Sequence, residues 1–441
     1  MPHTSLPDLL NRALSVLAPG AIVVAYSGGA DSHALLHALA HDAQARVRGL
    51  RALHVDHGLH ADSARWAAHC REVAAALDVS FASVRVDVER NGGTGIEDAA
   101  RKARMAAFAA QLLPGDILAL AQHRDDQAET VLLKLLRGAG PQGLGGMRGL
   151  REHEKVYLWR PLLELPRATL RDYAQANGLH WVDDSSNADT HLRRNFLRSE
   201  ILPRLGERWP DASAALAHSA NWARAAADFI DDEARKALAR LQGLDPTTLA
   251  WRGWLDLPDA LRDAVLRLWL RDLGLDEPAH FHVEELERQL RDAAGDRLPC
   301  VRFAHTELRR YRDLLYAMPP APTLPTNWQA QWGGTPLALP AGGRLELSPQ
   351  RQIENPLQVR YRRGGERIKP AGGAHTRELR LLLQETGVPP WRRARIPLIC
   401  RGDELLGVGD LYLSDAGESL CRELNARIVW SAGVDSTTRL G

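Results

Sequence analysis

The stretch from Ser27 to Ser32, SGGADS, has residue types that together could bind a phosphate group, and it directly follows a short apolar run from Ala21 to Tyr26. Its two adjacent glycines allow a sharp turn in which several backbone N–H groups face one point. A helix that begins after the turn adds its own unpaired N–H groups, which makes an anion site. The serine hydroxyls could donate to the same anion, and the Asp31 carboxylate could hold a divalent metal that bridges phosphate oxygens.

A second group of reactive side chains lies in the stretch from Gln122 to Thr130, QHRDDQAET. Asp126 and Glu129 are three residues apart and Asp125 and Glu129 four, so the carboxylates converge on the first turn of a helix. Acidic residues there stabilise a helix by roughly 0.3–1 kcal/mol each. Three carboxylates with His123 exceed what that purpose needs, so we expect them to bind Mg2+ or to hold the cationic amine of a second substrate and help remove its proton.

Arginines with a candidate role occur in two further stretches. Glu97, Arg101 and Arg104 are spaced so that they share one helix face. The plain interpretation is a solvated ion-pair stripe; the functional one is that the arginines contact phosphates and that Glu97 orients one of them. The segment 191–198, HLRRNFLR, follows Asn- and Asp-rich residues that favour a turn, and its cationic side could reach a phosphate.

Four apolar runs predict the strands that position these residues: 21–26, 50–55, 80–86 and 116–121. They alternate with helical patterns of ten or more residues, which is typical of βαβ units and a parallel sheet. Ligands bind such sheets at the carboxyl ends of the strands. We therefore expect the glycine turn, the acidic stretch and the backbone of His54 to Asp56 to meet at one edge, although the last is equally well explained as a plain loop.

The segment from Pro210 to about Tyr316 shows apolar residues at three- and four-residue spacing throughout. This pattern predicts a small helical domain. Its tryptophans fall within the apolar pattern, so we expect them in the core rather than as stacking platforms for bases: Trp222, Trp251, Trp254 and Trp269.

The last hundred residues show short strands, Gly-Gly turns and one amphipathic helix at 376–387, after a proline-rich stretch at 318–325. The predicted organisation is an α/β chain with a parallel-sheet nucleotide-binding domain, a helical domain, a linker and a C-terminal mixed α/β domain, with the bounds 1–209, 210–318, 319–343 and 344–441. Between Arg344 and Arg401, thirteen Arg or Lys stand against five Glu, although the whole chain carries a net charge of only +1. That segment is a candidate phosphate-binding surface.

Composition excludes several classes of protein. No apolar run reaches membrane length and the first twenty residues lack the features of a secretory leader, so we expect a cytoplasmic protein. The four cysteines show neither a CxxC motif nor zinc spacing, which argues against a disulfide framework or a cysteine metal site: Cys70, Cys300, Cys400 and Cys421.

The glycine turn is neither GxxxxGK[ST] nor GxGxxG; it resembles the SGGxDS loop (PP-loop) of the ATP pyrophosphatases. The motifs SGGADS, HVDHGL, GIEDAARKARM, QHRDDQAET with RGAGPQGLGGM, RPLL, and WVDDSSN with RRNFLR also occur in the order seen in the tRNA(Ile)-lysidine synthase family. This resemblance covers about residues 20–205. A weaker one, in YRRGGERI at 361–368 and VPPWRRARIPL at 388–398, resembles the family's C-terminal tRNA-binding domain.

The resemblance implies a PP-loop fold and a two-step ligation with ATP and Mg2+. ATP adenylates the oxygen at carbon two of the wobble cytidine of the isoleucine tRNA with a CAU anticodon, and free L-lysine then displaces AMP. By motif position, Ser27, Gly28, Gly29, Ala30, Asp31, Ser32, Val55 and one or both of Arg101 and Arg104 bind ATP, with Asp31 also at the metal. Val55 and its neighbours would contact the adenine or ribose.

The other residues carried over by motif position concern the two acceptor substrates. Asp126 and Glu129 would recognise and deprotonate lysine, and Arg194 and Asn195 would lie near the incoming cytidine. The expected tRNA contacts of the C-terminal domain are Arg362, Arg363, Arg367, Arg392 and Arg393. Asp31, Asp126, Glu129 and Arg194 are the expected catalytic residues, and a homodimer is left open.

Two positions depart from the family pattern. Gln122 stands where the family usually has the first of two histidines, and it cannot accept a proton as a histidine would. Met105 stands where an aromatic residue is common, which we interpret as a change in packing.

Three alternatives remain from the sequence. A PP-loop tRNA thiolation enzyme shares the loop but generally needs cysteines to carry sulfur. An amidating synthetase would leave the basic segment unexplained and would need an ammonia source. A non-enzymatic RNA-binding protein is disfavoured because the site residues are chemically complete.

Overall fold

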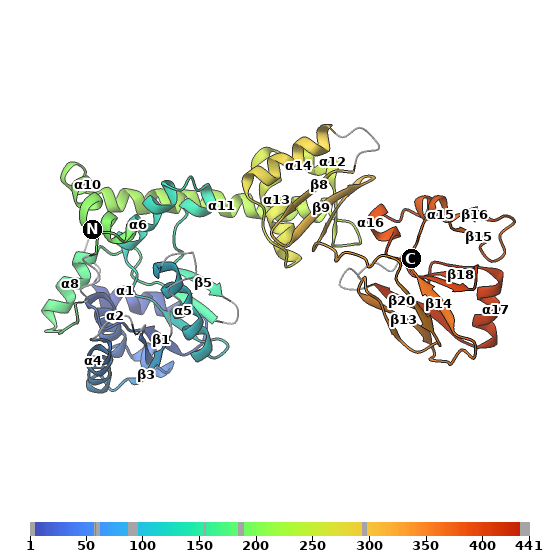
Figure 1. Ribbon diagram of the computed structural model, residues 1–441. Coiled ribbons are helices and arrows are strands. Elements are labelled where there is room, and N and C mark those ends of the chain that lie inside the picture. The colour runs from blue at the N-terminus through green and yellow to red at the C-terminus, as the bar shows by residue number, and fades with distance from the viewer. Residues whose placement is uncertain are drawn as a thin grey trace. The chain divides into compact units, whose positions relative to one another are not determined.

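The computed structural model describes residues 5–56, 58, 62–86, 96–153, 156–183, 189–292 and 298–432 (Figure 1). The chain divides into two compact units, Met1–Phe229 and Ile230–Gly441. None of the described helices has the length and apolar composition that a membrane span requires.

The first unit is built on a six-stranded sheet with the strand order β3-β2-β1-β4-β6-β5. All neighbouring strands are parallel except β5, which pairs antiparallel with β6. The strands are β1 (Ile22–Ala25), β2 (Arg51–Asp56), β3 (Ser80–Arg85), β4 (Ile117–Ala119), β5 (Leu150–His153) and β6 (Val156–Trp159). The predicted α/β fold with a parallel sheet is confirmed.

Helices cover both faces of this sheet. The helices of the unit are α1 (Leu6–Ser15), α2 (Ala30–Ala40), α3 (Ala43–Val47), α4 (Ser63–Ala76), α5 (Ile96–Gln111), α6 (Arg124–Leu135), α7 (Pro141–Leu144), α8 (Arg167–Ala176), α9 (Arg193–Phe196), the π-helix η2 (Leu197–Ile201), α10 (Leu202–Arg208) and α11 (Ala212–Leu241), which runs past residue 229. Ile22 and Val24 of β1 pack with α1, α2 and α8, whereas Val23 packs with Phe108 of α5 on the other face. This alternation along one strand produces the layered fold.

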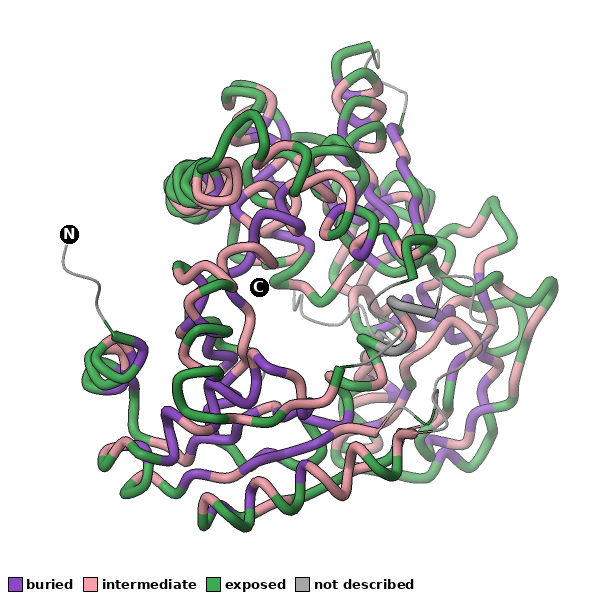
Figure 2. Tube along the Cα trace, turned by 90° about the vertical axis from the view of Figure 1, so that its left-hand side faces the viewer, coloured by how far each residue is buried: buried purple, intermediate pink, exposed green. Residues whose placement is uncertain are grey.

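The helices of the first unit differ in how much they bury. α1 buries Leu6, Leu10 and Leu14 along one side, and Figure 2 shows it beside the N-terminal label with buried and exposed residues on different sides. α2 is buried along most of its length because α1 and α8 both pack against it. The helix that follows the turn at Ser27 to Ser32 is thus packed on both sides.

Trp222 corrects one expectation, because it is 68% exposed rather than in the core. The buried face of α11 includes alanines at seven-residue spacing, Ala220, Ala227 and Ala234, and ends with Ala237 and Leu238. Trp222 is two residues from Ala220, about 200° around the helix, so it points away from those alanines. Its indole Nε1 donates to His218 Nε2 at 2.8 Å.

The second unit contains a four-stranded antiparallel sheet, β7-β10-β9-β8, packed with helices. Its elements are β7 (Thr248–Ala250), α12 (Trp251–Leu255), α13 (Asp259–Asp272), α14 (His280–Asp292), β8 (Cys300–Phe303), β9 (Thr306–Tyr311) and β10 (Leu314–Met318). Trp251, Trp254 and Trp269 are buried in this core, as expected. The expectation of an all-helical segment was wrong at 300–316, where Ala304 and Arg312 adopt positive φ in the hairpin turns.

The remainder of the second unit is β-rich. Its elements are β11 (Gln329–Trp332), β12 (Leu337–Ala338), β13 (Gly343–Ser348), β14 (Leu357–Arg360), β15 (Arg367–Ile368), β16 (Arg377–Glu378), α15 (Leu379–Glu385), α16 (Pro390–Arg393), β17 (Leu398–Arg401), β18 (Glu404–Val408), β19 (Tyr412–Leu413), α17 (Asp415–Glu423) and β20 (Arg427–Ala432). Their sheets have the orders β11-β14-β17-β18-β19, β12-β13-β20 and β15-β16. β11 and β12 lie within the range that the sequence assigns to the linker.

Candidate active site

The stretch from Ser27 to Ser32 forms the turn between β1 and α2, as predicted. Ser32 Oγ donates to the Gly29 carbonyl at 3.0 Å and lies 3.0 Å from Ser27 Oγ. The Ser27 N–H also points at Ser32 Oγ, at 3.3 Å. These bonds close the turn on itself, while the α2 N-cap residue, Gly29, makes no side-chain cap. The first N–H groups of α2 are therefore available for an anion.

The backbone conformation and the packing of the turn demand a glycine at position 28 but not at position 29. Gly28 is buried at φ +85°, and a Cβ atom on it would lie 2.9 Å from Cys70 Sγ. Gly29 has φ −74°, and a Cβ there would meet only Ser27 Oγ, at 3.6 Å. Only Gly28 thus requires the absence of a side chain.

Asp31 links this turn to the acidic stretch. One of its oxygens, Oδ2, lies 3.6 Å from His123 Nε2 and 3.6 Å from Arg167 Nε. The other, Oδ1, is buried and has no hydrogen-bond partner in the described structure. Burial alone would raise the pKa of Asp31, but the hydrogen bond and charge of His123 and the charges of Arg167 and Arg198 outweigh it and lower the pKa. Asp31 is thus held as a carboxylate.

His123 begins α6 and is almost completely buried. It forms a capping box with Asp126: the His123 N–H donates to Asp126 Oδ2 at 3.0 Å, and the Asp126 N–H donates to His123 Nδ1 at 3.4 Å. Burial opposes protonation, but Asp31, Asp126 and Asp125 together raise the pKa of His123. The sequence singled out this histidine but assigned it no role of its own.

Asp125 contacts the start of α8 as well as His123. Its Oδ2 accepts the Arg167 N–H at 2.8 Å, so it caps the first turn of α8. Asp125 therefore has the plain structural role that the sequence allowed for acids in this turn, and it ties α6 to α8.

Glu129 is fully buried, and its charge is balanced by arginines. Arg198 Nε donates to Glu129 Oε1 at 2.6 Å and Arg198 Nη2 to Oε2 at 3.0 Å, while the same Nη2 donates to Asp126 Oδ1 at 2.8 Å. Burial raises the pKa of Glu129 despite Arg198. Arg198 was not among the predicted site residues. Its position four residues after Arg194, on the same helix face, was the available signal.

Arg194 and Asn195 lie beside this cluster. Arg194 Nη2 donates to Thr130 Oγ1 at 2.9 Å, and its Nε is 3.5 Å from Glu129 Oε2. Asn195 is buried and donates to the Asp189 carbonyl at 3.0 Å. The structure thus brings Asp31, Asp126, Glu129 and Arg194 together at the strand ends.

Val55, half-buried at the end of β2, packs against the sheet core next to His54. His54 Nδ1 lies 2.9 Å from the Tyr26 carbonyl and 3.7 Å from Cys70 Sγ. The end of β2 therefore supports the residue that precedes the phosphate turn.

Arg101 and Arg104 are exposed on α5, whereas the side chain of Glu97 lies outside what the structure describes. Partial desolvation and the charges of Arg101 and Arg194 lower the pKa of Arg104. Met105 packs against the apolar cluster of Val23, Leu53 and Phe108, in line with a change in packing.

Gln122 is not a proton acceptor but a hydrogen-bond acceptor. Its Oε1 accepts Arg160 Nε, and Arg160 Nη1 donates to the Arg148 carbonyl at 3.0 Å. Arg160 is buried directly after β6, in the RPLL motif. No role for this arginine was predicted from the sequence.

The C-terminal arginines fall into two groups. Arg363 and Arg367 are exposed and form no ion pair within the described residues. Arg362 lies 3.5 Å from Glu366, which also accepts Arg360 Nη1 at 3.1 Å and the Arg363 N–H at 2.6 Å. These contacts lower the pKa of Glu366 against its burial. Glu366 thus holds the YRRGGERI turn together through these contacts, while the side chain of Arg363 remains exposed.

Arg392 and Arg393 lie beside Trp391 and two tyrosines of the antiparallel sheet. The Trp391 ring meets Tyr316 edge-on at 5.4 Å, and Arg392 lies 5.7 Å from the centre of the Tyr316 ring. Arg393 Nη2 donates to Tyr311 Oη at 3.0 Å. These arginines pack residues 388–393 against β9 and β10.

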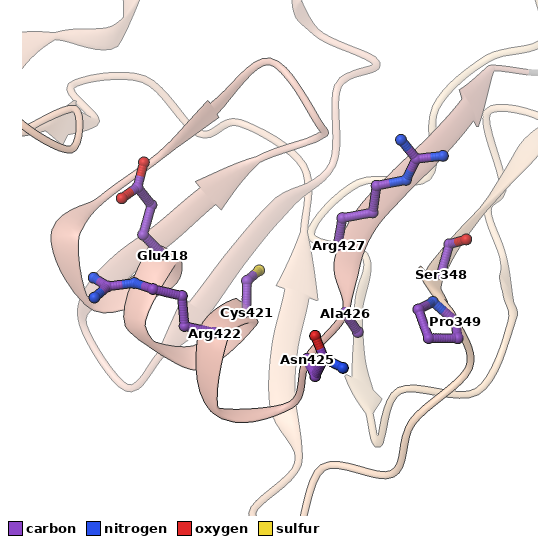
Figure 3. A pocket seen from close by; sticks show the side chains of 8 residues that line it. All are labelled: Ser348, Pro349, Glu418, Cys421, Arg422, Asn425, Ala426 and Arg427. Atoms are coloured by element: carbon purple, nitrogen blue, oxygen red, sulfur yellow. The ribbon is translucent and has the colours of Figure 1, made fainter.

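Neither a hollow near α17 nor a metal-binding cluster among the described residues adds a residue to the candidate active site. A hollow of about 480 Å3 near α17, drawn in Figure 3, contains none of the predicted residues and is lined by Ser348, Pro349, Glu418, Cys421, Arg422, Asn425, Ala426 and Arg427. In the parts of the chain that the structure describes, no three His, Cys, Asp or Glu side chains have the arrangement of a metal centre.

Known families match the chain along most of its length. A model described as the PP-loop domain matches residues 4–205, one described as the TilS substrate binding domain matches 249–316, and one described as the TilS substrate C-terminal domain matches 357–430. A tRNA(Ile)-lysidine synthase of Xanthomonas campestris pv. campestris (strain 8004) is 45% identical over 421 residues, 93% of this chain and 95% of the relative. The chain belongs to the tRNA(Ile)-lysidine synthase family.

Other relatives agree with this assignment. A tRNA(Ile)-lysidine synthase of Pseudomonas aeruginosa is 42% identical over 96% of this chain and 97% of its own. A solved structure of a U34-tRNA thiolase from Methanococcus maripaludis covers 48% of this chain and 76% of its own at 16% identity and a TM-score of 0.38, too low to carry an argument. The lysidine synthase resemblance predicted from the motifs is confirmed.

Proposed function

We propose that this protein joins the ε-amine of free L-lysine to carbon two of the wobble cytidine in the isoleucine tRNA with a CAU anticodon. The observation that carries the proposal is the link from Asp31 through His123 to Asp126, with separations of 3.6 and 3.4 Å. It joins a phosphate-binding turn to an amine-binding acid cluster. In the reaction, the carbonyl oxygen attacks the α-phosphate of ATP and pyrophosphate leaves; the lysine nitrogen then bonds to carbon two and AMP leaves with the C–O electron pair.

ATP would lie over the start of α2. The backbone N–H groups from Gly28 to Ser32 and the Ser27 hydroxyl would hold its phosphates, and the backbone at Val55 its adenine or ribose. Arg101 and Arg104, exposed and without ion pairs in the described structure, would hold phosphate oxygens.

Asp31 fits a magnesium ion, because its buried Oδ1 has no hydrogen-bond partner in the described structure and its pKa is lowered. Mg2+ is commonly held by one or two carboxylates, water and substrate phosphates, so a larger protein cage is not needed. The bound ion would offset the negative charge of the leaving pyrophosphate.

The acid cluster offers two carboxylates to a cationic amine. Asp31, Asp126 and Glu129 contact the guanidinium groups of Arg167, Arg198 and Arg194. The lysine ammonium would bind at Asp126 and Glu129. Glu129, with its raised pKa, is the better of the two to take the proton before the amine attacks.

The tRNA would meet the enzyme at two sets of residues. Arg194 and Asn195 would lie by the cytidine, while Arg363 and Arg367 would contact phosphates of the tRNA body. Arg362, Arg392 and Arg393, which make internal contacts, would hold the segments that present them. We place the protein in the cytoplasm, where ATP, lysine and tRNA occur together. A measurement of the molecular mass in solution tests whether it forms a homodimer.

The thiolation alternative fits the structure less well. All four cysteines are free thiols, and burial raises the pKa of each, that of Cys70 to about 12. None is thus an activated thiolate that could carry sulfur.

The test combines purified protein, ATP, Mg2+, radiolabelled lysine and the CAU tRNA transcript. We expect label in the tRNA with release of AMP and pyrophosphate, and none in a transcript with uridine at the wobble position. Sulfur incorporation without lysine incorporation would favour the thiolation enzyme instead.

A further inference from the structure

Arg160 is a buried cation without a carboxylate partner. Its side chain follows β6 at the carboxyl edge of the sheet and is 7% exposed. Across the residues that the structure describes, no carboxylate forms an ion pair with it. A buried charge without a partner is costly, so its presence calls for an explanation.

The guanidinium is fixed in direction without being neutralised. Gln122 Oε1 accepts Nε, and the Arg148 carbonyl accepts Nη1 at 3.0 Å. Both acceptors are neutral dipoles. The third nitrogen, Nη2, has no hydrogen-bond partner within the described ranges and stays free to donate.

The charges of two other arginines act on Arg160. Burial first, and then the like charges of Arg101 and Arg151, lower the pKa of Arg160 to about 10, so it remains charged at neutral pH. Arg101 and Arg151 are exposed and are likewise without an ion pair in the described structure. Three guanidinium groups without a counter-charge repel one another, and an anion among them would relieve both the repulsion and the burial cost.

The arrangement borders the proposed active site. β4 and β6 are neighbours in the sheet, and Gln122 is followed directly by His123, which contacts Asp31. Any anion bound at Arg160 would therefore lie beside the reacting substrates. Both ATP and RNA bring phosphate groups to that place.

We propose that Arg160, held by Gln122 and assisted by Arg101, forms a phosphate-binding site for a phosphate group of a substrate, either of ATP or of the RNA strand beside the cytidine. This deepens the proposed function and rests on it for the identity of the substrates. Gln122 is then a positioning residue, whose neutral amide orients the guanidinium and leaves its charge for the ligand.

The test uses the full chain in three variants: Gln122→Glu, Arg160→Gln and, as a control, Arg171→Gln, which changes an exposed arginine of α8 without a partner in the described structure. Calorimetry measures binding of ATP with Mg2+ and, separately, of an RNA stem-loop with the CAU anticodon, both without lysine. Thermal unfolding is followed in parallel. No turnover is needed, so the outcome does not depend on lysidine formation.

Glutamate at position 122 would neutralise Arg160 in place. We expect Gln122→Glu to raise the Tm but to weaken the binding of one probe, either ATP or the RNA, about tenfold. Arg160→Gln should weaken the binding of the same probe at least as much without lowering the Tm. Loss confined to ATP assigns the nucleotide phosphate, and loss confined to RNA, with a shallower salt dependence, assigns the RNA backbone. Unchanged binding of both probes, or a lower Tm with both weakened alike, would overturn the proposal.

Discussion

The charged side chains at the strand ends of the first unit are arranged in the opposite way to two arginines of the basic segment 344–401, Arg363 and Arg367. At the strand ends, Arg198 pairs with both Asp126 and the fully buried Glu129. In the basic segment, Arg363 and Arg367 are exposed, with no ion pair among described residues. Buried charges depend on one another because each lowers the cost of burying the next, whereas exposed charges act almost independently. The comparison predicts that substitutions at the strand ends have large and coupled effects on stability and activity. Substitutions of the exposed arginines should have small and additive effects on tRNA binding.

The largest effect is expected for Asp126→Asn. The amide can keep the hydrogen bond from the His123 N–H but loses the charge that would hold and deprotonate lysine. We expect lysine transfer to fall about 10²- to 10⁴-fold while ATP affinity changes little. Lysine incorporation and ATP binding are measured together, with Asp172→Asn, which changes an exposed carboxylate of α8, as the control. A loss of ATP binding and folding would show that Asp126 is structural.

The next effect concerns Arg198, which balances Glu129. Arg198→Met leaves a fully buried carboxylate without its bidentate partner, which costs about 3–5 kcal/mol in the free energy of unfolding. Adding Glu129→Gln removes that charge and should recover more than half of the loss. Urea unfolding of both single variants and the double variant gives the coupling energy. Additive losses would mean that the strand-end charges are as independent as those of the basic segment.

The smallest effects are expected in the basic segment. Three exposed arginines are changed: Arg363, Arg367 and Arg380, the last of which lies on α15. Arg363→Gln, Arg367→Gln and Arg380→Gln should each weaken tRNA binding about two- to threefold and reduce the slope of log K against log salt concentration by about one. The triple variant should show the product of the three factors. Filter binding at several salt concentrations measures this, with Arg288→Gln on α14 as the control. A far larger loss in one single variant would indicate a coupled contact like that of Arg198.

The sequence was informative where chemistry and local geometry coincide. Asp31 and Asp126 stand in contiguous motifs at the ends of predicted strands, and a parallel sheet brings such ends together. The roles of Arg198 and Arg160 depend instead on burial and on partners far away in the chain, Glu129 and Gln122. A stretch with several arginines does not indicate which one turns inward.

Trp222 and the hairpins at 300–318 show a second limit. Periodicity identifies an apolar face but not which of its residues are covered, and in α11 the covered residues are the small alanines. The strands β8 to β10 contain enough apolar residues at mixed spacing to resemble helices. Their turns form at Ala304 and Arg312, which are not typical turn residues.

The hydrogen bond from the Val182 N–H to the Gly28 carbonyl, at 3.0 Å, has a thermodynamic consequence. It ties the phosphate turn to the chain that leads, eleven residues later, into the arginine helix α9. A nucleotide that shifts Gly28 would thereby shift Val182, which precedes the segment that we propose to contact the RNA substrate. Linkage makes such a bias reciprocal: the factor by which ATP changes the affinity for tRNA is the factor by which tRNA changes the affinity for ATP.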